Sequence, residues 1–319
     1  MTARLIAAAL ALATAAVSAQ GLSDRPITLV VPVPPGGILD HVARVVAPSM
    51  GAALGQTGVI DNQAGASGNR AASAVARAKA DGHTMLVGYS MFHVGNPTMF
   101  SQPGWDPIKD FAPVAMLVVS SHVVAVHPSL PVKTLKELVD YARANPGKLN
   151  YATSGNGSVP HVGMELFKQQ TKIDVVHVPY KGAGPAMIDV VAGNVQMTIA
   201  TPPSLMAQVQ GGKLRALAVA AKNRHPLLPQ VPTTGEAGYP DFELEAWVAL
   251  FAPSGTPADA VSKLSAAAQF SLQDADVRKA MDAAGIEIRY QNPARLDQQV
   301  RQDLDYWSKV IRNAGITVH

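Results

Sequence analysis

The feature that most limits the fold of this chain is a repeated alternation of short β-branched runs with stretches of helical periodicity. Each run is closed by Gly, Pro, Ser or Thr before the helical pattern starts. Near-continuous apolar strands that alternate with helices are typical of parallel sheets covered on both faces. The pattern therefore predicts an α/β protein, with strands at 27–33, 84–90, 123–127, 149–154, 175–180, 195–201 and 214–220.

The spacing of these strands predicts two lobes. A chain of 319 residues, 48% of them hydrophobic, can bury a core large enough for two lobes. The chain is expected to cross between the lobes twice, near 121–124 and near 245–249. We therefore expect lobe 1 to comprise 20–123 and 247–319, and lobe 2 to comprise 124–246, each a mostly parallel sheet flanked by helices with a cleft between the lobes.

The N-terminus reads as an export signal. Arg4 precedes an apolar run, and Val17-Ser18-Ala19 has the small residues of a cleavage site, so 1–19 is expected to be a signal peptide removed near Ala19. The alternative is a buried N-terminal helix. The run is shorter than the ~20 residues that span a bilayer. The chain contains no cysteine, which excludes disulfides and thiol catalysis and suits an oxidising compartment. We expect a soluble, exported protein.

The joint after the first predicted strand is a candidate anion site. Pro34-Pro35-Gly36-Gly37 leads directly into a helix, so backbone N–H groups and the partial positive charge of the helix start are open to a ligand. The same joint could be an ordinary strand–helix turn. It lacks the Gly-Lys-Ser/Thr of a phosphate loop and the third glycine of a dinucleotide fingerprint. Asp40, one turn into the helix, could cap that helix or meet a polar group of a ligand.

A second stretch follows the same logic. The strand that ends near Ser154 continues as Ser154-Gly155-Asn156-Gly157-Ser158 and then enters a helix that carries His161. Two glycines and two hydroxyls at a helix start again provide hydrogen-bond donors for an anion. Two such turns, expected on different lobes, predict one ligand held from both sides.

Other classes of function have less support. The net charge is +3, with 26 basic and 23 acidic residues and no basic stripe, so no nucleic-acid partner is expected. His161 and Glu165 lack the second histidine of a zinc motif, and no Gly-x-Ser-x-Gly occurs. We expect no enzyme, metal or organic cofactor. The catalytic alternative is an exported hydrolase or isomerase that uses Ser154, Ser158 and His161.

Seven motifs in register give the chain a family resemblance from Arg25 to Ile316. They are RPITLVVPVPPGGILDHVAR, LGQTGVIDNQAGASGN, DGHTMLVG, TSGNGSVPHVGMELF, VHVPYKGAGPAMIDVVAGNVQ, GGKLRALAVAAKNRHPLLPQVPTTGEAGYPDF and APSGTPADAVSKL. The chain resembles the Bug-type extracytoplasmic solute-binding proteins, which are the receptors of tripartite tricarboxylate transporters. The resemblance implies a monomeric, periplasmic two-lobe receptor of the flytrap type. It would close on a small carboxylate and deliver it to integral-membrane permease subunits. A sensor that presents its ligand to a membrane kinase is the alternative.

The resemblance also implies site residues. In this family backbone amides, hydroxyls and waters hold the carboxylate. Carried over by position, the implied ligand-binding residues are Val33, Pro34, Pro35, Gly36, Gly37, Asp40, Ser154, Gly155, Gly157, Ser158, His161, Tyr180 and Thr201.

The chain departs from the family pattern after the strand at 84–90, at Tyr89-Ser90-Met91-Phe92-His93, where small polar residues are usual. Phe92 and its neighbours would add flat apolar surface, and Ser90 and His93 could bond a second carboxylate. An aromatic mono- or dicarboxylate such as terephthalate would suit that mixture. Alternatively, two of the aromatic side chains pack in the core, because alternate strand residues face opposite sides.

Overall fold

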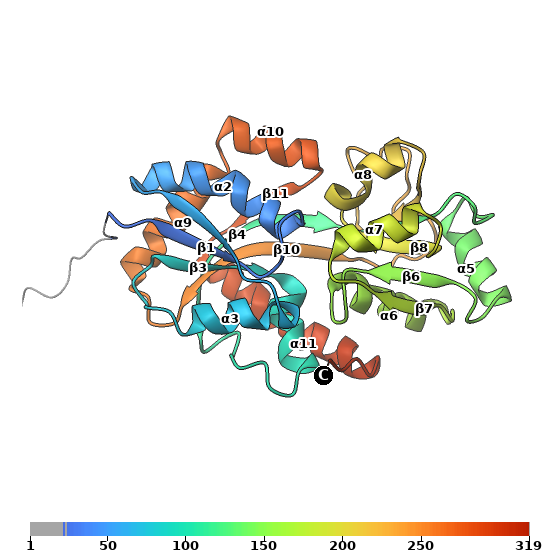
Figure 1. The fold of residues 1–319 in the computed structure, drawn as a ribbon, viewed down its shortest axis with the longest axis horizontal. Helices are drawn as coiled ribbons and strands as arrows, with labels where there is room; N and C mark the ends of the chain where they lie inside the picture. The colour runs from blue at the N-terminus through green and yellow to red at the C-terminus, as the bar shows by residue number, and fades with distance from the viewer. Residues whose placement is uncertain (1–21, 23, 319) are drawn as a thin grey trace, which may run out of the picture.

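The structure is a computed structural model that describes residues 22 and 24–318 of the chain. The expected signal peptide at 1–19 lies outside the described residues. Two separate sheets lie at the two ends of an elongated molecule (Figure 1). Within the described residues no helix combines the length and the apolar character needed to cross a membrane.

The first sheet has six strands in the order β11-β4-β10-β3-β1-β2. Its strands are β1 (Ile27–Val31), β2 (Gly58–Asn62), β3 (Thr84–Tyr89), β4 (Phe111–Ser121), β10 (Glu245–Pro253) and β11 (Glu287–Gln291). The elements around it are α2 (Ile38–Leu54), η1 (Ala66–Gly68), α3 (Asn69–Ala76), η2 (Met91–Gly95), α4 (Asn96–Met99), α9 (Ala258–Ser271), α10 (Ala275–Ala284) and α11 (Pro293–Asn313). Helices α2 and α10 cover one face, and α3 and α11 cover the other (Figure 1).

The second sheet has five strands in the order β7-β6-β8-β5-β9. Its strands are β5 (Val123–Val126), β6 (Asn150–Thr153), β7 (Val176–Pro179), β8 (Met197–Ala200) and β9 (Arg215–Val219). Its helices are α5 (Leu135–Ala144), α6 (Val159–Thr171), α7 (Ala183–Val191) and α8 (Pro202–Gln210). Apolar residues of α5 and α6 belong to the main core, whereas α7 and α8 share a smaller core on the other face.

The predicted two-lobe α/β fold is confirmed, but the expectation of mostly parallel sheets is wrong. Strands β1, β2 and β3 pair in parallel, whereas β10 runs antiparallel to both β3 and β4. In the second sheet β5 runs antiparallel to β8 and β9. The reason is the connection between lobes: the chain leaves the first sheet along β4 and returns along β10, so these neighbouring strands must run in opposite directions. Both sheets are therefore mixed.

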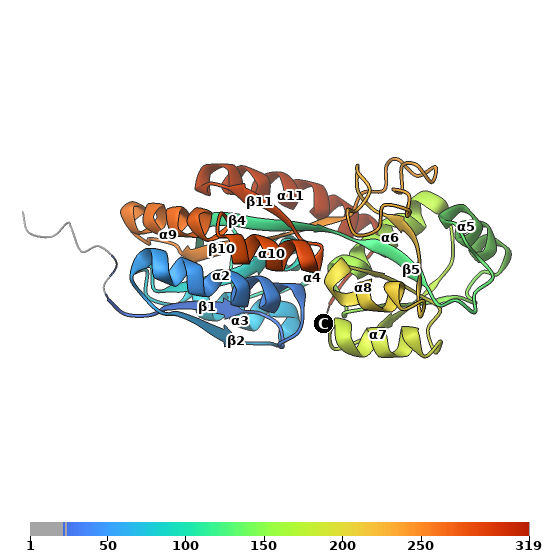
Figure 2. The same ribbon diagram turned by 90° about the horizontal axis from the view of Figure 1, so that it is seen from above.

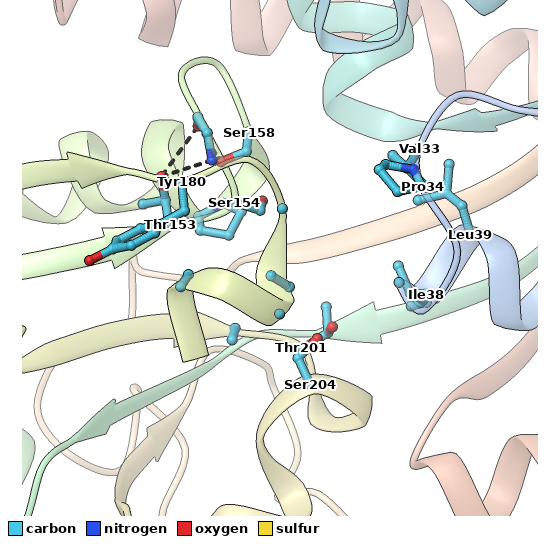
Figure 3. A pocket seen from close by; sticks show the side chains of 18 of the residues that line it. Val33, Pro34, Ile38, Leu39, Thr153, Ser154, Ser158, Tyr180, Thr201 and Ser204 are labelled. Carbon is cyan, nitrogen blue, oxygen red and sulfur yellow. Dashed lines mark hydrogen bonds between the residues drawn. The ribbon is translucent and has the colours of Figure 1, made fainter. Parts of the chain in front are cut away.

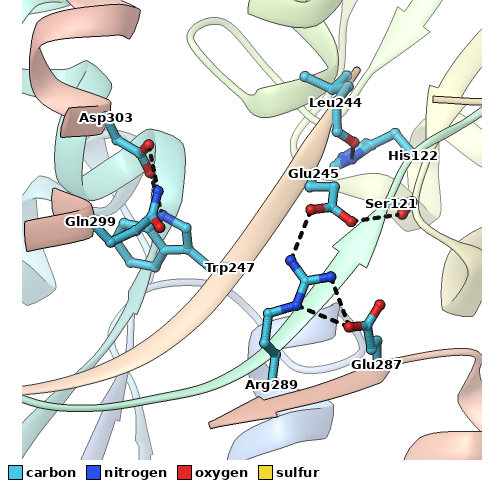
Figure 4. A network of polar contacts seen from close by, with 9 residues as sticks. All are labelled: Ser121, His122, Leu244, Glu245, Trp247, Glu287, Arg289, Gln299 and Asp303. Carbon is cyan, nitrogen blue, oxygen red and sulfur yellow. Dashed lines mark hydrogen bonds and ion pairs between the residues drawn. The ribbon is translucent and has the colours of Figure 1, made fainter. Parts of the chain in front are cut away.

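The two connections between the sheets lie side by side and are hydrogen-bonded to each other. The backbone N–H of His122 donates to the Leu244 carbonyl at 3.0 Å, and the N–H of Ala220 donates to the His122 carbonyl at 2.8 Å. Next to them Glu245 accepts from Arg289 at 3.0 Å and from the Ser121 hydroxyl at 3.4 Å (Figure 4). These two neighbouring segments join the lobes, and Figure 2 shows the chain running from β4 in one lobe to β5 in the other. The lobe boundaries expected at 123/124 and 246/247 stay a prediction.

Helix α2 follows the loop of residues 33–37, the first loop, and contains Pro48 in its interior. A proline inside a helix removes a backbone hydrogen bond, so the sequence at Pro48 predicts a break near Ala47. The helix instead continues to Leu54. Val46 before the proline and Met50 after it are both fully buried, so tertiary packing holds both halves in line.

Candidate functional site

A cavity of about 430 Å³ opens between the two lobes. This volume lies within the range of small-molecule sites. Figure 3 shows side chains of the first lobe, such as Val33, facing those of the second lobe, such as Ser154 and Thr201. The lining comes from the first loop, the segments after β2 and β3, and the segments that follow β6, β7 and β8. Of the predicted site residues it contains Val33, Pro34, Pro35, Gly36, Gly37, Phe92, Ser154, Gly155, Ser158, Tyr180 and Thr201.

The first loop opens the N-terminus of α2 to this cavity. Gly37 is the N-cap residue, with an extended backbone (φ −95°, ψ 175°) and no capping side chain. Ile38 and Leu39, the first two helical residues, line the cavity. Among the described residues no acceptor bonds to their backbone N–H groups. The start of α2 therefore presents backbone N–H donors and a partial positive charge to the cavity.

Asp40 supports the first loop from behind and does not line the cavity. Its carboxylate accepts from the Gly36 N–H at 3.1 Å, from Arg44 Nε at 3.0 Å and from Asn62 Nδ2 at 3.0 Å. Asn62 Nδ2 also donates to the Val33 carbonyl at 3.0 Å. Burial opposes ionisation, but these bonds outweigh it and hold the pKa of the Asp40 carboxyl below its usual value. The predicted ligand contact is thus replaced by a structural role.

The second loop, 154–158, is held by its own polar groups. The Ser158 hydroxyl donates to the Gly155 carbonyl at 2.7 Å, and the Gly155 N–H donates to Thr153 Oγ1 at 3.2 Å. Gly155 and Gly157 have φ values of 133° and 73°, which residues other than glycine rarely adopt. The Ser154 side chain makes no hydrogen bond with any described residue and faces the cavity (Figure 3).

Ser154 and Ser158 should therefore respond differently to substitution. Ser154→Ala is expected to weaken ligand binding about tenfold without lowering the melting temperature, because only the bond to the ligand is lost. Ser158→Ala should lower both the ligand affinity and the melting temperature, because the Ser158 hydroxyl fixes the loop. We expect the free energy of unfolding to fall by about 1 kcal/mol. Calorimetric titration and thermal unfolding of both variants check this. Equal melting temperatures for the two variants would contradict the assignment.

Gly157 and His161 lie outside the cavity lining. The N–H of Gly157 donates to Nδ1 of His161 at 3.0 Å, so the imidazole faces the back of the loop. The Ser158 hydroxyl is bonded to Gly155, and no hydrogen bond joins Ser158 to His161 in the described residues. Gly157 and His161 were expected to contact the ligand, but the structure places both outside the cavity lining. Ser158 and His161, two of the three residues of the catalytic alternative, are not arranged as a nucleophile and its base.

The segment after β3 divides between cavity and core. Tyr89 and Phe92 line the cavity, with ring centroids 5.6 Å apart. Ser90 and His93 are buried and outside its lining. His93 stacks on Phe251 at 3.9 Å, and burial lowers the pKa of its imidazole to about 3, against the opposing bond to the Pro107 carbonyl. The apolar wall is thus present, but the predicted contacts of Ser90 and His93 with a second carboxylate are not.

Two further helix starts reach the cavity, and sequence reasoning missed them in part. Gly182, Ala183 and Gly184 begin α7, and Ser204 joins Thr201 at the start of α8. The run Gly-Ala-Gly-Pro after a strand has the same character as the other two loops and could have identified α7. Tyr180 lines the cavity, but its hydroxyl donates to Asp189 at 2.5 Å and is directed away (Figure 3).

Among the described residues that line the cavity there is no lysine, arginine, aspartate or glutamate. His122 is its only histidine, and burial lowers the pKa of that imidazole to about 4, against the opposing bond to the Leu244 carbonyl. It is therefore uncharged at neutral pH. The described residues hold no group of three or more side chains suited to a metal ion. An anion would be stabilised here by helix starts, backbone N–H groups and hydroxyls.

The fold and the cavity define a two-lobe α/β solute-binding protein. The family model described as the tripartite tricarboxylate transporter family receptor matches residues 42–316. Protein BugT of Bordetella pertussis is 34% identical over 321 residues, with 99% of this chain and 98% of that protein covered. The chain belongs to this family and is a Bug-type receptor.

Solved structures agree in fold and sequence. The periplasmic binding protein BugD superposes with a TM-score of 0.85 at 32% identity, covering 92% of this chain and 99% of that one. Rpa4515 of R. palustris with adipate gives a TM-score of 0.87 at 37% identity, over 92% of this chain and 98% of that one. MatC of Rhodopseudomonas palustris with bound malate gives 0.84 at 36% identity, over 90% of this chain and 99% of that one.

Proposed function

We propose that this chain captures a small carboxylate-bearing solute in the cavity between its lobes and delivers it to the membrane permease of a tripartite tricarboxylate-type transporter. One observation carries the proposal. The starts of four helices, α2, α6, α7 and α8, meet around one cavity whose lining has no charged side chain at neutral pH. Helix starts are suited to anions, since each carries about half a positive charge and free N–H groups.

The ligand contacts we propose come from both lobes. In the first lobe they are the first loop, above all Gly37, together with Phe92. In the second they are Ser154, Gly155, Ser158, Tyr180 and Thr201, and we add Ala183, Gly184 and Ser204 because they line the same cavity. A micromolar dissociation constant corresponds to about −8 kcal/mol. Hydrogen bonds to a charged group contribute ~1.5–3 kcal/mol each. One set of contacts from each lobe therefore suffices for micromolar affinity.

Because neither lobe holds both sets of contacts, ligand binding favours the closed arrangement of the lobes. The hinge is the strand pair at His122 and Leu244. We propose that the receptor acts in the periplasm as a monomer. Uptake of the ligand by cells that carry or lack the permease genes tests delivery. Uptake that persists without them would favour a sensor.

Within the carboxylates we propose an aromatic acid, such as terephthalate or a benzoate. Tyr89 and Phe92 supply flat apolar surface, and Pro34 and Ile38 extend it toward the start of α2. The competing class is aliphatic dicarboxylates, since related proteins hold adipate and malate. Aromatic rings prefer offset or edge-to-face contact with other rings, which Tyr89 and Phe92 offer.

A thermal-shift screen of the mature protein tests whether the chain binds a carboxylate and whether it prefers an aromatic one. The panel comprises citrate, malate, succinate, adipate, benzoate, phthalate and terephthalate, with the uncharged amide of benzoate as the matched control. A ligand at a thousandfold excess over its dissociation constant stabilises the native state by about 4 kcal/mol. We expect the largest shift with an aromatic acid and none with the amide. A shift with aliphatic acids alone would overturn the aromatic assignment, and no shift at all would contradict the receptor function.

A further inference from the structure

Behind the second loop lies a stack of three rings that the ligand cavity does not include. The imidazoles of His161, on α6, and His177, on β7, are 3.9 Å apart with an angle of 9° between their planes. The ring of Tyr151, on β6, stacks on His177 at 4.9 Å. The stack therefore ties the helix that begins at this loop to the two strands beside it.

Both imidazoles are hydrogen-bonded to the loop or to the residue that starts it. Nδ1 of His161 accepts from the N–H of Gly157 at 3.0 Å. Nε2 of His177 lies 2.6 Å from Thr153 Oγ1, which in turn accepts from the N–H of Gly155 at 3.2 Å. The two backbone N–H groups on either side of Asn156 are thus fixed by the histidine pair, one directly and one through Thr153.

We propose that His161 and His177 are positioning residues that, as neutral imidazoles, hold the second loop in its ligand-binding conformation. The inference rests on the proposed function of that loop. Gly155 and Gly157 have left-handed φ values and no side chains to restrict them. Ordering one residue costs about 1–2 kcal/mol, so a loop fixed before the ligand arrives binds it more tightly.

The geometry requires an uncharged ring at His161. An imidazole nitrogen can accept from Gly157 only while it carries no proton, which fixes His161 as the tautomer with its proton on Nε2. The charged groups that face the pair are Glu165 and Lys168 of α6, which are paired with each other at 2.8 Å. Tyr151 donates its hydroxyl to the same Glu165 oxygen at 2.8 Å.

The pKa values agree with this state. Burial lowers the pKa of both imidazoles, and that of His177 falls to about 3 with a further contribution from His161. Between this value and the usual 6.5 the unfolded chain binds more protons than the folded chain. Stability therefore falls as the pH drops through this range, and it is fully retained above 6.5.

The test replaces each histidine twice. His161→Phe keeps a flat ring but removes the acceptor, whereas His161→Asn places Oδ1 where Nδ1 was and cannot titrate. His177→Phe and His177→Gln make the same comparison. His127→Phe is the control, because this half-buried histidine of the same lobe is bonded to Ser129 and lies outside the stack. The readouts are amide exchange of Gly155 and Gly157 in the ligand-free protein, ring-nitrogen shifts of His161 against pH, and adipate affinity.

We expect His161→Phe to lower both the exchange protection of Gly157 and the affinity for adipate at least about tenfold, or ~1.4 kcal/mol. His161→Asn should restore both, and His127→Phe should change neither. Unchanged protection in His161→Phe, or a His161 ring with a proton on Nδ1 at pH 7, would overturn the proposal. If wild-type protein fails to bind any acid of the panel while Gly157 stays protected through His161, the proposed function fails and the loop-holding role does not.

Discussion

Replacing Gly37 with leucine is expected to lower the affinity for a carboxylate at least ~100-fold while the fold is retained, since two lost charge-assisted bonds amount to ~3–6 kcal/mol. The backbone of Gly37 is extended, and a Cβ built on it has no heavy atom within 4 Å. A larger side chain therefore enters open space beside the free N–H groups of α2. It occupies the place of the anion without disturbing the core.

Gly37→Ala is the matched control for this prediction. One methyl group leaves most of the space free, so the affinity should fall less than about tenfold. Calorimetric titration with the best acid of the panel measures both variants, and circular dichroism checks that they are folded. If Gly37→Leu binds as tightly as the wild type, the first loop does not belong to the site.

Asp40→Ala is expected to destabilise the protein by about 2–3 kcal/mol, because three donors in or near the first loop lose their acceptor. The Gly36 N–H then loses its acceptor, and the Asn62 amide keeps its bond to the Val33 carbonyl but loses the one to Asp40, so the loop that carries Gly37 loses support and affinity falls as well. The low pKa of Asp40 means that its contribution is present above about pH 3.8 and is lost as the pH falls further. The difference between variant and wild type should shrink there.

Asp297→Ala provides the comparison. Asp297 pairs with Arg301 at the same spacing that joins Asp40 to Arg44, but on the exposed face of α11. An exposed pair of this kind contributes about 0–1 kcal/mol. Chemical denaturation of both variants at pH 7 measures the difference. Asp40→Ala with normal stability but lost affinity would instead make Asp40 a ligand contact.

Local patterns carried most of the correct predictions. The seven expected strands are all present, with each end within two residues of the prediction, because a short apolar run closed by a turn residue is a local signal. The Asn292-Pro293 pair, a cap residue before a proline, is another local signal: Asn292 Oδ1 accepts from the Arg295 N–H at 3.0 Å at the start of α11. Four strands, β2, β4, β10 and β11, were not predicted. Of these, β4 and β10 lead to and from the second lobe and make the first sheet mixed.

Phe92, His93 and Asp40 have roles that could not be predicted from the sequence. Phe92 and His93 are neighbours with similar shapes, yet one lines the cavity and the other stacks on Phe251, far along the chain. Asp40 is held by Asn62, a residue of a strand that was not predicted. Such roles depend on partners that only the folded chain brings together.

The sequence by itself determined the two-lobe α/β class and the loops at the starts of α2 and α6, because a strand end, a glycine turn and a helix start are all set by neighbouring residues. Only the tertiary structure decided that four helix starts share one cavity, that Tyr180 directs its hydroxyl away to Asp189, and that His161 lies behind its loop. The physical reason is that the direction of a side chain is fixed by packing and hydrogen bonds with residues distant in sequence.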